Sequence, residues 1–260
     1  MKSISLAGKI IVVTGGTQGI GAAIALDAAR SGADGVCITG RNTESGKEMV
    51  TALERLGAKG HYLPADLADA AAAQSIMQDA IAGFGRVDGL VNAAGITDRG
   101  SIEDTSVELW DRMFAVNVRA PFILTQALVH HLRKGQRPGC IVNIITRSSH
   151  GGQPFLTAYS ASKGALATLT KNNAHALRFD RIRVNGLNIG WTDTPGEHAI
   201  QKRDGKRSDW LAKAEPLQPF GRLIKPDDVS FLAVYLLSDA AEMITGALID
   251  FDQNVMGAYD

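Results

Sequence analysis

The sequence predicts an α/β fold, a doubly wound parallel sheet between two layers of helices, formed by a single domain over residues 1–260. Three observations predict it. Short apolar runs rich in β-branched residues alternate with longer segments of helical periodicity. The strand-like runs are almost wholly apolar, as expected for strands covered on both faces by helices. The alternation continues from end to end without a repeat, a low-complexity tract or a long linker.

The expected elements follow in order. Strands are expected at residues 10–13, 36–39, 61–63, 89–91, 140–145, 182–187 and 247–251. Helices are expected at residues 19–31, 44–56, 70–84, 107–132, 158–177 and 227–237. Strands separated by helices form βαβ units with right-handed crossovers, and the sheet they build is parallel.

One segment breaks this rhythm. Residues 191–220 are polar and contain Pro195, Pro216 and Pro219. An interruption of this length in a compact fold indicates a functional loop, and we expect a lid over a substrate.

The composition narrows the class of protein. Hydrophobic residues make up 45% and charged residues 21%, and 27 basic side chains balance 27 acidic ones. No global field favours nucleic acid or an anionic membrane. The first residues lack a signal-peptide pattern, and no apolar run approaches membrane-spanning length. Cys37 and Cys140 lie in apolar runs and indicate reduced core thiols. A cytoplasmic protein that acts on a small molecule is expected, with no metal site.

Tyr159 and Lys163 stand four residues apart in a predicted helix, so both side chains lie on one face. A nearby ammonium favours the phenolate and is expected to lower the pKa of the tyrosine. The pair is therefore a candidate proton-transfer device near neutral pH. Because this spacing is common by chance, its weight depends on the other motifs.

A glycine-rich turn connects the first strand to the first helix. It reads Thr14-Gly15-Gly16-Thr17-Gln18-Gly19-Ile20-Gly21, with the spacing Gly-x-x-x-Gly-x-Gly. Glycine permits close approach of the backbone to a ligand, and the helix N-terminus favours a pyrophosphate. A purely structural turn is the alternative interpretation.

With this turn the chain begins to resemble the short-chain dehydrogenase/reductase family, and the resemblance continues across the whole chain. The matching residues are Thr14, Gly15, Gly19 and Gly21 in the turn, Asp66 after the third strand, Asn92 and Gly95 after the fourth, Asn117 in a helix, Tyr159 and Lys163, and finally Gly190 and Thr194. Leu67, Ala93 and Thr192 lie beside these positions and are expected to contact the cofactor as well. Ala93 stands where the family has a second asparagine, and Ile189 where it has proline. The resemblance implies a Rossmann-type fold, a nicotinamide cofactor bound by these residues, and a homotetramer.

The choice between NAD and NADP depends on the end of the second strand. NAD-binding folds place an acid there to bind the ribose 2′-hydroxyl. Gly40 takes that place and Arg41 follows, and an arginine can pair with a 2′-phosphate. This favours NADP, although Arg41 could be only a solvated residue. Gln18 weakens the case, because NADP-preferring relatives often carry a basic residue there.

The resemblance also implies the catalytic roles. Tyr159 is the acid in reduction and the base in oxidation, Lys163 lowers its pKa and binds ribose, and Asn117 holds a water. Asn117 could instead be a satisfied buried amide. The family's serine, thirteen residues before the tyrosine, is Thr146 here, and Ser148 is the alternative hydroxyl.

The predicted lid suggests the substrate class. Charged residues dominate positions 197–215, which favours a polar substrate such as a sugar, a polyol or a hydroxy acid. These charges could instead form the outer face of a lid helix. His150, Gln153 and Trp191 are candidate substrate contacts. The main hypothesis is an NAD(P)-dependent oxidoreductase for secondary alcohols and carbonyls. A 3-oxoacyl reductase and a catalytically impaired dinucleotide-binding scaffold are the alternatives.

Overall fold

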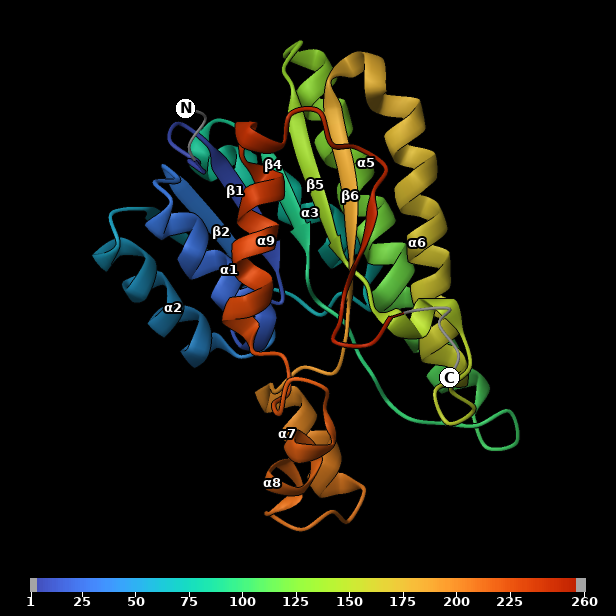
Figure 1. The fold of residues 1–260 in the computed structure, drawn as a ribbon. Helices are drawn as coiled ribbons and strands as arrows, with labels where there is room; N and C mark the ends of the chain where they lie inside the picture. The colour runs from blue at the N-terminus through green and yellow to red at the C-terminus, as the bar shows by residue number, and fades with distance from the viewer. Residues whose placement is uncertain (1–3, 256–260) are drawn as a thin grey trace.

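A parallel sheet forms the centre of the molecule, and helices cover both of its faces (Figure 1). The computed structural model describes residues 4–255, and in this range the sheet has seven strands in the order β3-β2-β1-β4-β5-β6-β7. The strands are β1 (Ile10–Thr14), β2 (Gly35–Gly40), β3 (Lys59–Pro64), β4 (Gly89–Asn92), β5 (Gly139–Ile144), β6 (Ile182–Ile189) and β7 (Leu248–Phe251). The predicted doubly wound α/β fold is confirmed.

The helices begin and end close to the expected residues. They are α1 (Gly19–Arg30), α2 (Thr43–Arg55), α3 (Ala70–Phe84), α4 (Val107–Phe114), α5 (Ala120–Lys134), α6 (Thr157–Leu177), α7 (Pro195–Arg203), α8 (Trp210–Ala214) and α9 (Pro226–Leu237). Local signals fix several ends. The Asp69 carboxylate accepts a hydrogen bond from the Ala71 N–H at the start of α3, and Gly85 ends that helix in the left-handed conformation.

Alternate residues of β1 face the two helical layers. Ile11 and Val13 pack in one core with α1 and α9, whereas Ile10 and Val12 pack in a second core with α3 and α5. Burial on both faces explains why the strand is apolar throughout. Both cysteines are buried and unpaired in these layers, as the sequence indicates.

The single helix expected at residues 107–132 is interrupted. A π-helical turn at Ala115–Arg119 separates α4 from α5. Pro121 lacks an N–H and cannot donate to the carbonyl of Asn117 four residues earlier, so a regular α-helix cannot pass through this point. The periodicity is the same on both sides, which is why the pattern alone did not reveal the break.

The polar segment after β6 forms its own projecting unit. Figure 1 shows α7 and α8 below the edge of the sheet where the parallel strands end. Trp191 and Trp210 stack within this segment, with ring centroids 5.8 Å apart. The segment is thus largely helical rather than an open loop. No helix within residues 4–255 combines the length and the apolar character that a membrane span requires.

Candidate active site

A cavity of about 740 Å³ lies at the carboxyl ends of the strands, between the sheet and the segment that carries α7. Residues that directly follow β1, β3, β4, β5 and β6 line it. The strand that follows β1 in the chain, β2, lies on one side of β1, whereas β4 lies on its other side. The strand order therefore reverses at β1, and in open α/β sheets ligands bind at such a reversal.

The glycine turn forms one wall of the cavity. Gly15 has φ +66°, and a Cβ there would lie 2.9 Å from the Ala94 Cα. Gly19 opens α1 with φ +56°, and Gln18 at the N-cap gives no side-chain hydrogen bond to the helix. The first turn of α1 therefore keeps N–H groups for a ligand, since no cap accepts from them. The wall fits a pyrophosphate, and Thr17, Gln18, Ile20 and Gly21 line it as well.

The end of β2 has no room for an acid. A Cβ at Gly40 would lie 2.6 Å from the Thr17 methyl and 2.7 Å from its hydroxyl. Arg41 is exposed at the cavity rim and, among the described residues, its guanidinium forms no ion pair.

Asp66 and Leu67 line the same end of the cavity. The Asp66 carboxylate accepts from the Ala68 N–H at 3.0 Å and from Arg112 at 3.2 Å. These two bonds, with the charges of Arg112 and Arg41, lower the pKa of Asp66. The two positive charges of Arg41 and Arg112 exceed the single negative charge of Asp66, so this end of the cavity favours an anion.

Tyr159 and Lys163 lie near the start of α6 and both line the cavity. The Lys163 ammonium donates to the Ile144 carbonyl at 2.8 Å and lies 5.9 Å from the centre of the Tyr159 ring. Burial lowers the pKa of Lys163 to about 8.

The Tyr159 pKa departs from the sequence expectation. Burial raises it to about 12, and the hydrogen bond with Thr146 lowers it by less. The Tyr159 pKa is thus raised where the sequence led us to expect a lowered one, because loss of hydration outweighs the effect of Thr146.

A chain of polar side chains leads away from Tyr159. Thr146 lies close enough to Tyr159 to lower the pKa of the phenol, and its hydroxyl donates to the Ser148 hydroxyl at 3.3 Å. Ser148 donates in turn to the Gln153 amide oxygen. All four side chains line the cavity, and Thr146 is the hydroxyl that acts on the pKa of the phenol.

Three expected site residues do not line the cavity. The Asn117 amide is buried, donating to the Ile96 carbonyl and the Ser162 hydroxyl and accepting from the Ile96 N–H. The side chain of Asn117 therefore fixes the loop after β4, and its carboxamide does not face the cavity.

Asn92 and His150 are the other two. The buried Asn92 amide donates to the Asn143 carboxamide oxygen at 2.8 Å and ties β4 to β5. His150 lies 3.1 Å from the Asp250 carboxylate, beside β7. His150 does not line the cavity in this structure, because its ring is held by Asp250, so its expected contact with a substrate stays a prediction.

The end of the cavity beside α7 contains residues that the sequence motifs did not single out. Gln153 and Trp191 line the cavity, together with Arg99, Phe155, Glu197 and Lys206. Arg99 follows β4 on the strand edge where sites form, and this was the one signal available for it.

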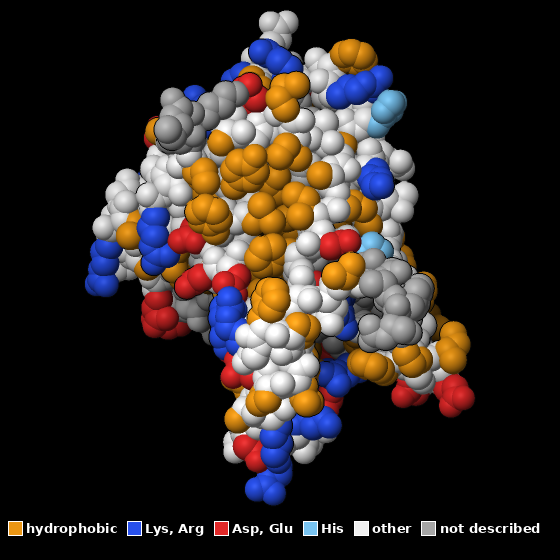
Figure 2. Space-filling view, in the orientation of Figure 1, with side chains coloured by type: hydrophobic (Ala, Val, Ile, Leu, Met, Phe, Trp, Pro, Cys, Tyr) orange, Lys and Arg blue, Asp and Glu red, His pale blue; other side chains and the backbone are white. Residues whose placement is uncertain are grey.

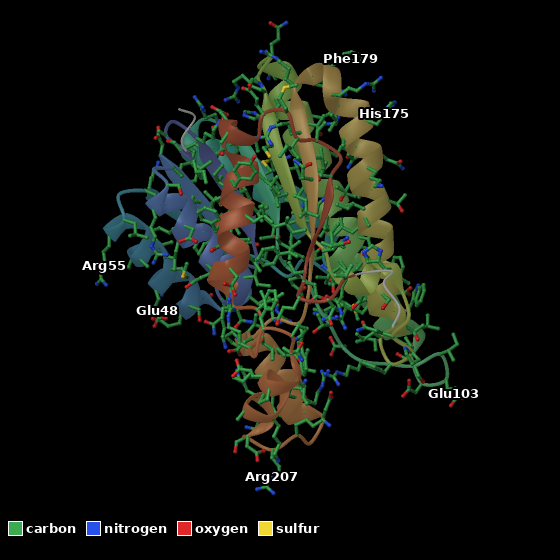
Figure 3. The ribbon with its side chains drawn as sticks, viewed as in Figure 1. Glu48, Arg55, Glu103, His175, Phe179 and Arg207 are labelled. Atoms are coloured by element: carbon green, nitrogen blue, oxygen red, sulfur yellow. The ribbon has the colours of Figure 1, made fainter. Side chains whose placement is uncertain are left out.

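Ion pairs connect the loop after β4 to α7 and to the residue that follows it. The Arg99 guanidinium lies 3.0 Å from the Asp204 carboxylate and 3.7 Å from that of Glu197. Arg203 pairs with Asp98 at 2.6 Å. Other charges of the segment lie outside the cavity, and Figure 3 shows Arg207 at its outer tip. The charges of the segment are thus divided between the cavity wall and the outer face of the segment.

Comparisons with known proteins agree with this geometry. A family model described as enoyl-(acyl carrier protein) reductase matches residues 15–253. A cyclopentanol dehydrogenase from a Comamonas species is 36% identical over 94% of this chain and 95% of its own length. Gluconate 5-dehydrogenase from Gluconobacter oxydans is 32% identical over 96% of each chain.

A solved structure extends the comparison. It is described as a putative NAD(P)-dependent gluconate 5-dehydrogenase from Beutenbergia cavernae with bound NADP, and it superimposes with a TM-score of 0.85 at 34% identity. The alignment covers 96% of this chain and 97% of that one. The chain therefore belongs to the short-chain dehydrogenase/reductase family, whose members use NAD or NADP to interconvert alcohol and carbonyl groups.

Proposed function

We propose that this protein is an NADP-preferring oxidoreductase that interconverts a secondary alcohol and a carbonyl on a polar small molecule, with Tyr159 as the proton-transferring group. The observation that carries the proposal is that Thr146, Tyr159 and the buried Lys163 line one cavity that continues to the glycine turn. The nicotinamide supplies or accepts the hydride when bound.

The residues around Tyr159 support a proton-transfer role. With its pKa raised to about 12, the phenol holds its proton at neutral pH and can give it to a carbonyl oxygen in reduction. The Lys163 ammonium stabilises the phenolate that forms, and the Thr146 hydroxyl offers a hydrogen bond to the same oxygen. The side-chain amide of Asn117 already has its hydrogen-bond partners. The group of Asn117 that we propose to hold a water is therefore its backbone carbonyl.

The preference for NADP rests on the end of β2. Thr17 occupies the space that an acid would need, and Arg41 is free to pair with a 2′-phosphate. An Arg41→Ala variant is expected to raise the KM for NADP by about 10- to 100-fold, the value of one charge-assisted bond. The KM for NAD should change little. Equal effects on both cofactors would refute the assignment.

The segment at 191–220 is proposed as a lid. Its ion pairs with Arg99 and Asp98 hold it against the loop after β4, and Glu197 and Lys206 bring charge to the cavity. A charged wall supports a polar substrate and disfavours a long acyl chain. We propose that the lid and the sheet belong to one domain.

We also propose a homotetramer in the cytoplasm. Figure 2 shows hydrophobic side chains gathered over α9 and the adjoining C-terminal segment. Phe231 of α9 is 64% exposed, and Met243 is 89% exposed. A patch of this kind supports burial against a second copy, and the unpaired cysteines support a reducing compartment.

The test follows reduced nicotinamide by absorbance, with NADP or NAD and a panel of sugars, polyols, hydroxy acids and simple secondary alcohols. Turnover that falls by about 10²- to 10⁴-fold in Tyr159→Phe supports the proposal. Full turnover in that variant would refute the mechanism. Bound cofactor with no turnover of any panel member or of a 3-oxoacyl thioester would favour the scaffold, and turnover of the thioester alone would favour the acyl reductase.

A further inference from the structure

The carboxylate of Glu197 is held in the cavity by one of its two oxygens. Oε1 accepts from the Trp191 indole N–H at 2.9 Å and from the Gln201 amide at 2.6 Å, and it lies 3.7 Å from the Arg99 guanidinium. In the described part of the chain no hydrogen bond reaches Oε2. Glu197 lines the cavity, and its side chain is 17% exposed.

This arrangement fixes the direction of the carboxylate. Three donors from different parts of the chain crowd around Oε1, so the group cannot rotate freely. A carboxylate oxygen accepts and never donates when ionised. The group that Oε2 can bind is therefore a hydrogen-bond donor, and in a neutral polar substrate that donor is a hydroxyl.

Glu197 also lies within electrostatic reach of the reacting end of the cavity. Its negative charge adds to the raised pKa of Tyr159, of which burial is the main cause. Glu197 and Tyr159 line the same cavity, so one substrate can contact both. The neighbouring groups of the wall, Trp191 and Gln201, already donate to Oε1 and leave Oε2 as the exposed acceptor.

We infer that Glu197 is a specificity-determining residue whose free oxygen accepts a hydrogen bond from a second hydroxyl of the substrate, so that the enzyme selects diols and polyols over simple secondary alcohols. The inference rests on the proposed function and names the substrate feature that the site recognises. A site built to bond a hydroxyl rejects the analogue that lacks it, because its polar group is then left unpaired.

Butan-2-ol, butane-1,3-diol and butane-2,3-diol test this with one carbon skeleton. We expect the wild type to prefer at least one diol by kcat/KM. In Glu197→Gln the ratio of kcat/KM between the preferred diol and butan-2-ol should fall about tenfold or more, the value of a hydrogen bond to a charged group. The rise of kcat/KM with pH should move to lower pH for all three alcohols, because a negative charge that raises the Tyr159 pKa is removed.

Glu215→Gln is the matched control. Glu215 belongs to the same segment but pairs with Lys225 and does not line the cavity, so the ratio between the alcohols should stay unchanged. Equal losses for all three alcohols in Glu197→Gln would assign the residue a structural role and overturn the inference. A wild type that oxidises butan-2-ol without preferring a diol overturns it and leaves the proposed function intact. With NADP bound, a wild type that oxidises none of the three overturns the inference, and one that also turns over no member of the wider panel overturns both.

Discussion

Replacing Lys163 with methionine is expected to stabilise the protein while abolishing its activity. Burial lowers the pKa of Lys163 from 10.5 to about 8. At ~1.4 kcal/mol per pKa unit, the buried charge costs about 3 kcal/mol of unfolding free energy at neutral pH. The lost hydrogen bond to the Ile144 carbonyl offsets about 1 kcal/mol of the gain. The net gain of about 2 kcal/mol raises the melting temperature by about 5 °C.

The sign depends on pH. Below pH 8 the folded lysine is protonated and the whole penalty is present, so the stabilisation of Lys163→Met is greatest there. Between about 8 and 10.5 the folded wild type has lost the proton that the unfolded chain still holds, and the penalty disappears as pH rises. Above that window only the lost hydrogen bond remains, and the variant becomes the less stable protein.

The assay is urea and thermal unfolding followed by circular dichroism at pH 7 and at pH 10. Lys171→Met is the matched control, because Lys171 is exposed on the same helix and its replacement should leave the unfolding free energy nearly unchanged. Turnover measured on the same samples should fall in Lys163→Met only. A Lys163→Met variant less stable than the wild type at pH 7 would refute the reasoning that burial makes this charge costly.

Three further predictions concern the same site. Thr146→Ala should lower kcat by about 10²-fold and Ser148→Ala by much less, because Thr146 contacts the phenol; steady-state kinetics decide, and the reverse order would exchange their roles. Gly21→Ala should destabilise the fold by about 2 kcal/mol, because a Cβ there would strike the backbone of the glycine turn; Gly164→Ala, with only an ordinary 3.5 Å contact, is the control in thermal unfolding. For alcohol oxidation, kcat/KM should rise with pH, because the phenolate of Tyr159 forms toward a pKa of about 12; a profile flat from pH 6 to 10 would contradict it.

Much of the fold was predictable because its signals are local. The apolar strands and the helical periods between them are set by burial on both sheet faces, and the strand positions agree with the expected ones. The break at Ala115–Arg119 was missed, since its cause is the one missing N–H of Pro121 within a continuous period.

The residues of the site also divide into those that local sequence signals predicted and those whose position only the structure revealed. Gly15, Gly19, Tyr159 and Lys163 were found from spacing, because the chemistry they serve needs a turn or a shared helix face. The place of His150 outside the cavity could not be predicted, because a neighbouring position in the chain does not fix the direction of a ring held by Asp250.

The sequence by itself determined the alternation of strands and helices, the glycine turn and the Tyr159–Lys163 pair, because each depends on residues close together in the chain. Only the tertiary structure decided which hydroxyl acts on the Tyr159 pKa, how burial sets that pKa, and that the donors around Glu197 gather at one of its two oxygens. These properties arise from packing between segments far apart in the chain, where hydration is lost and side-chain directions are fixed.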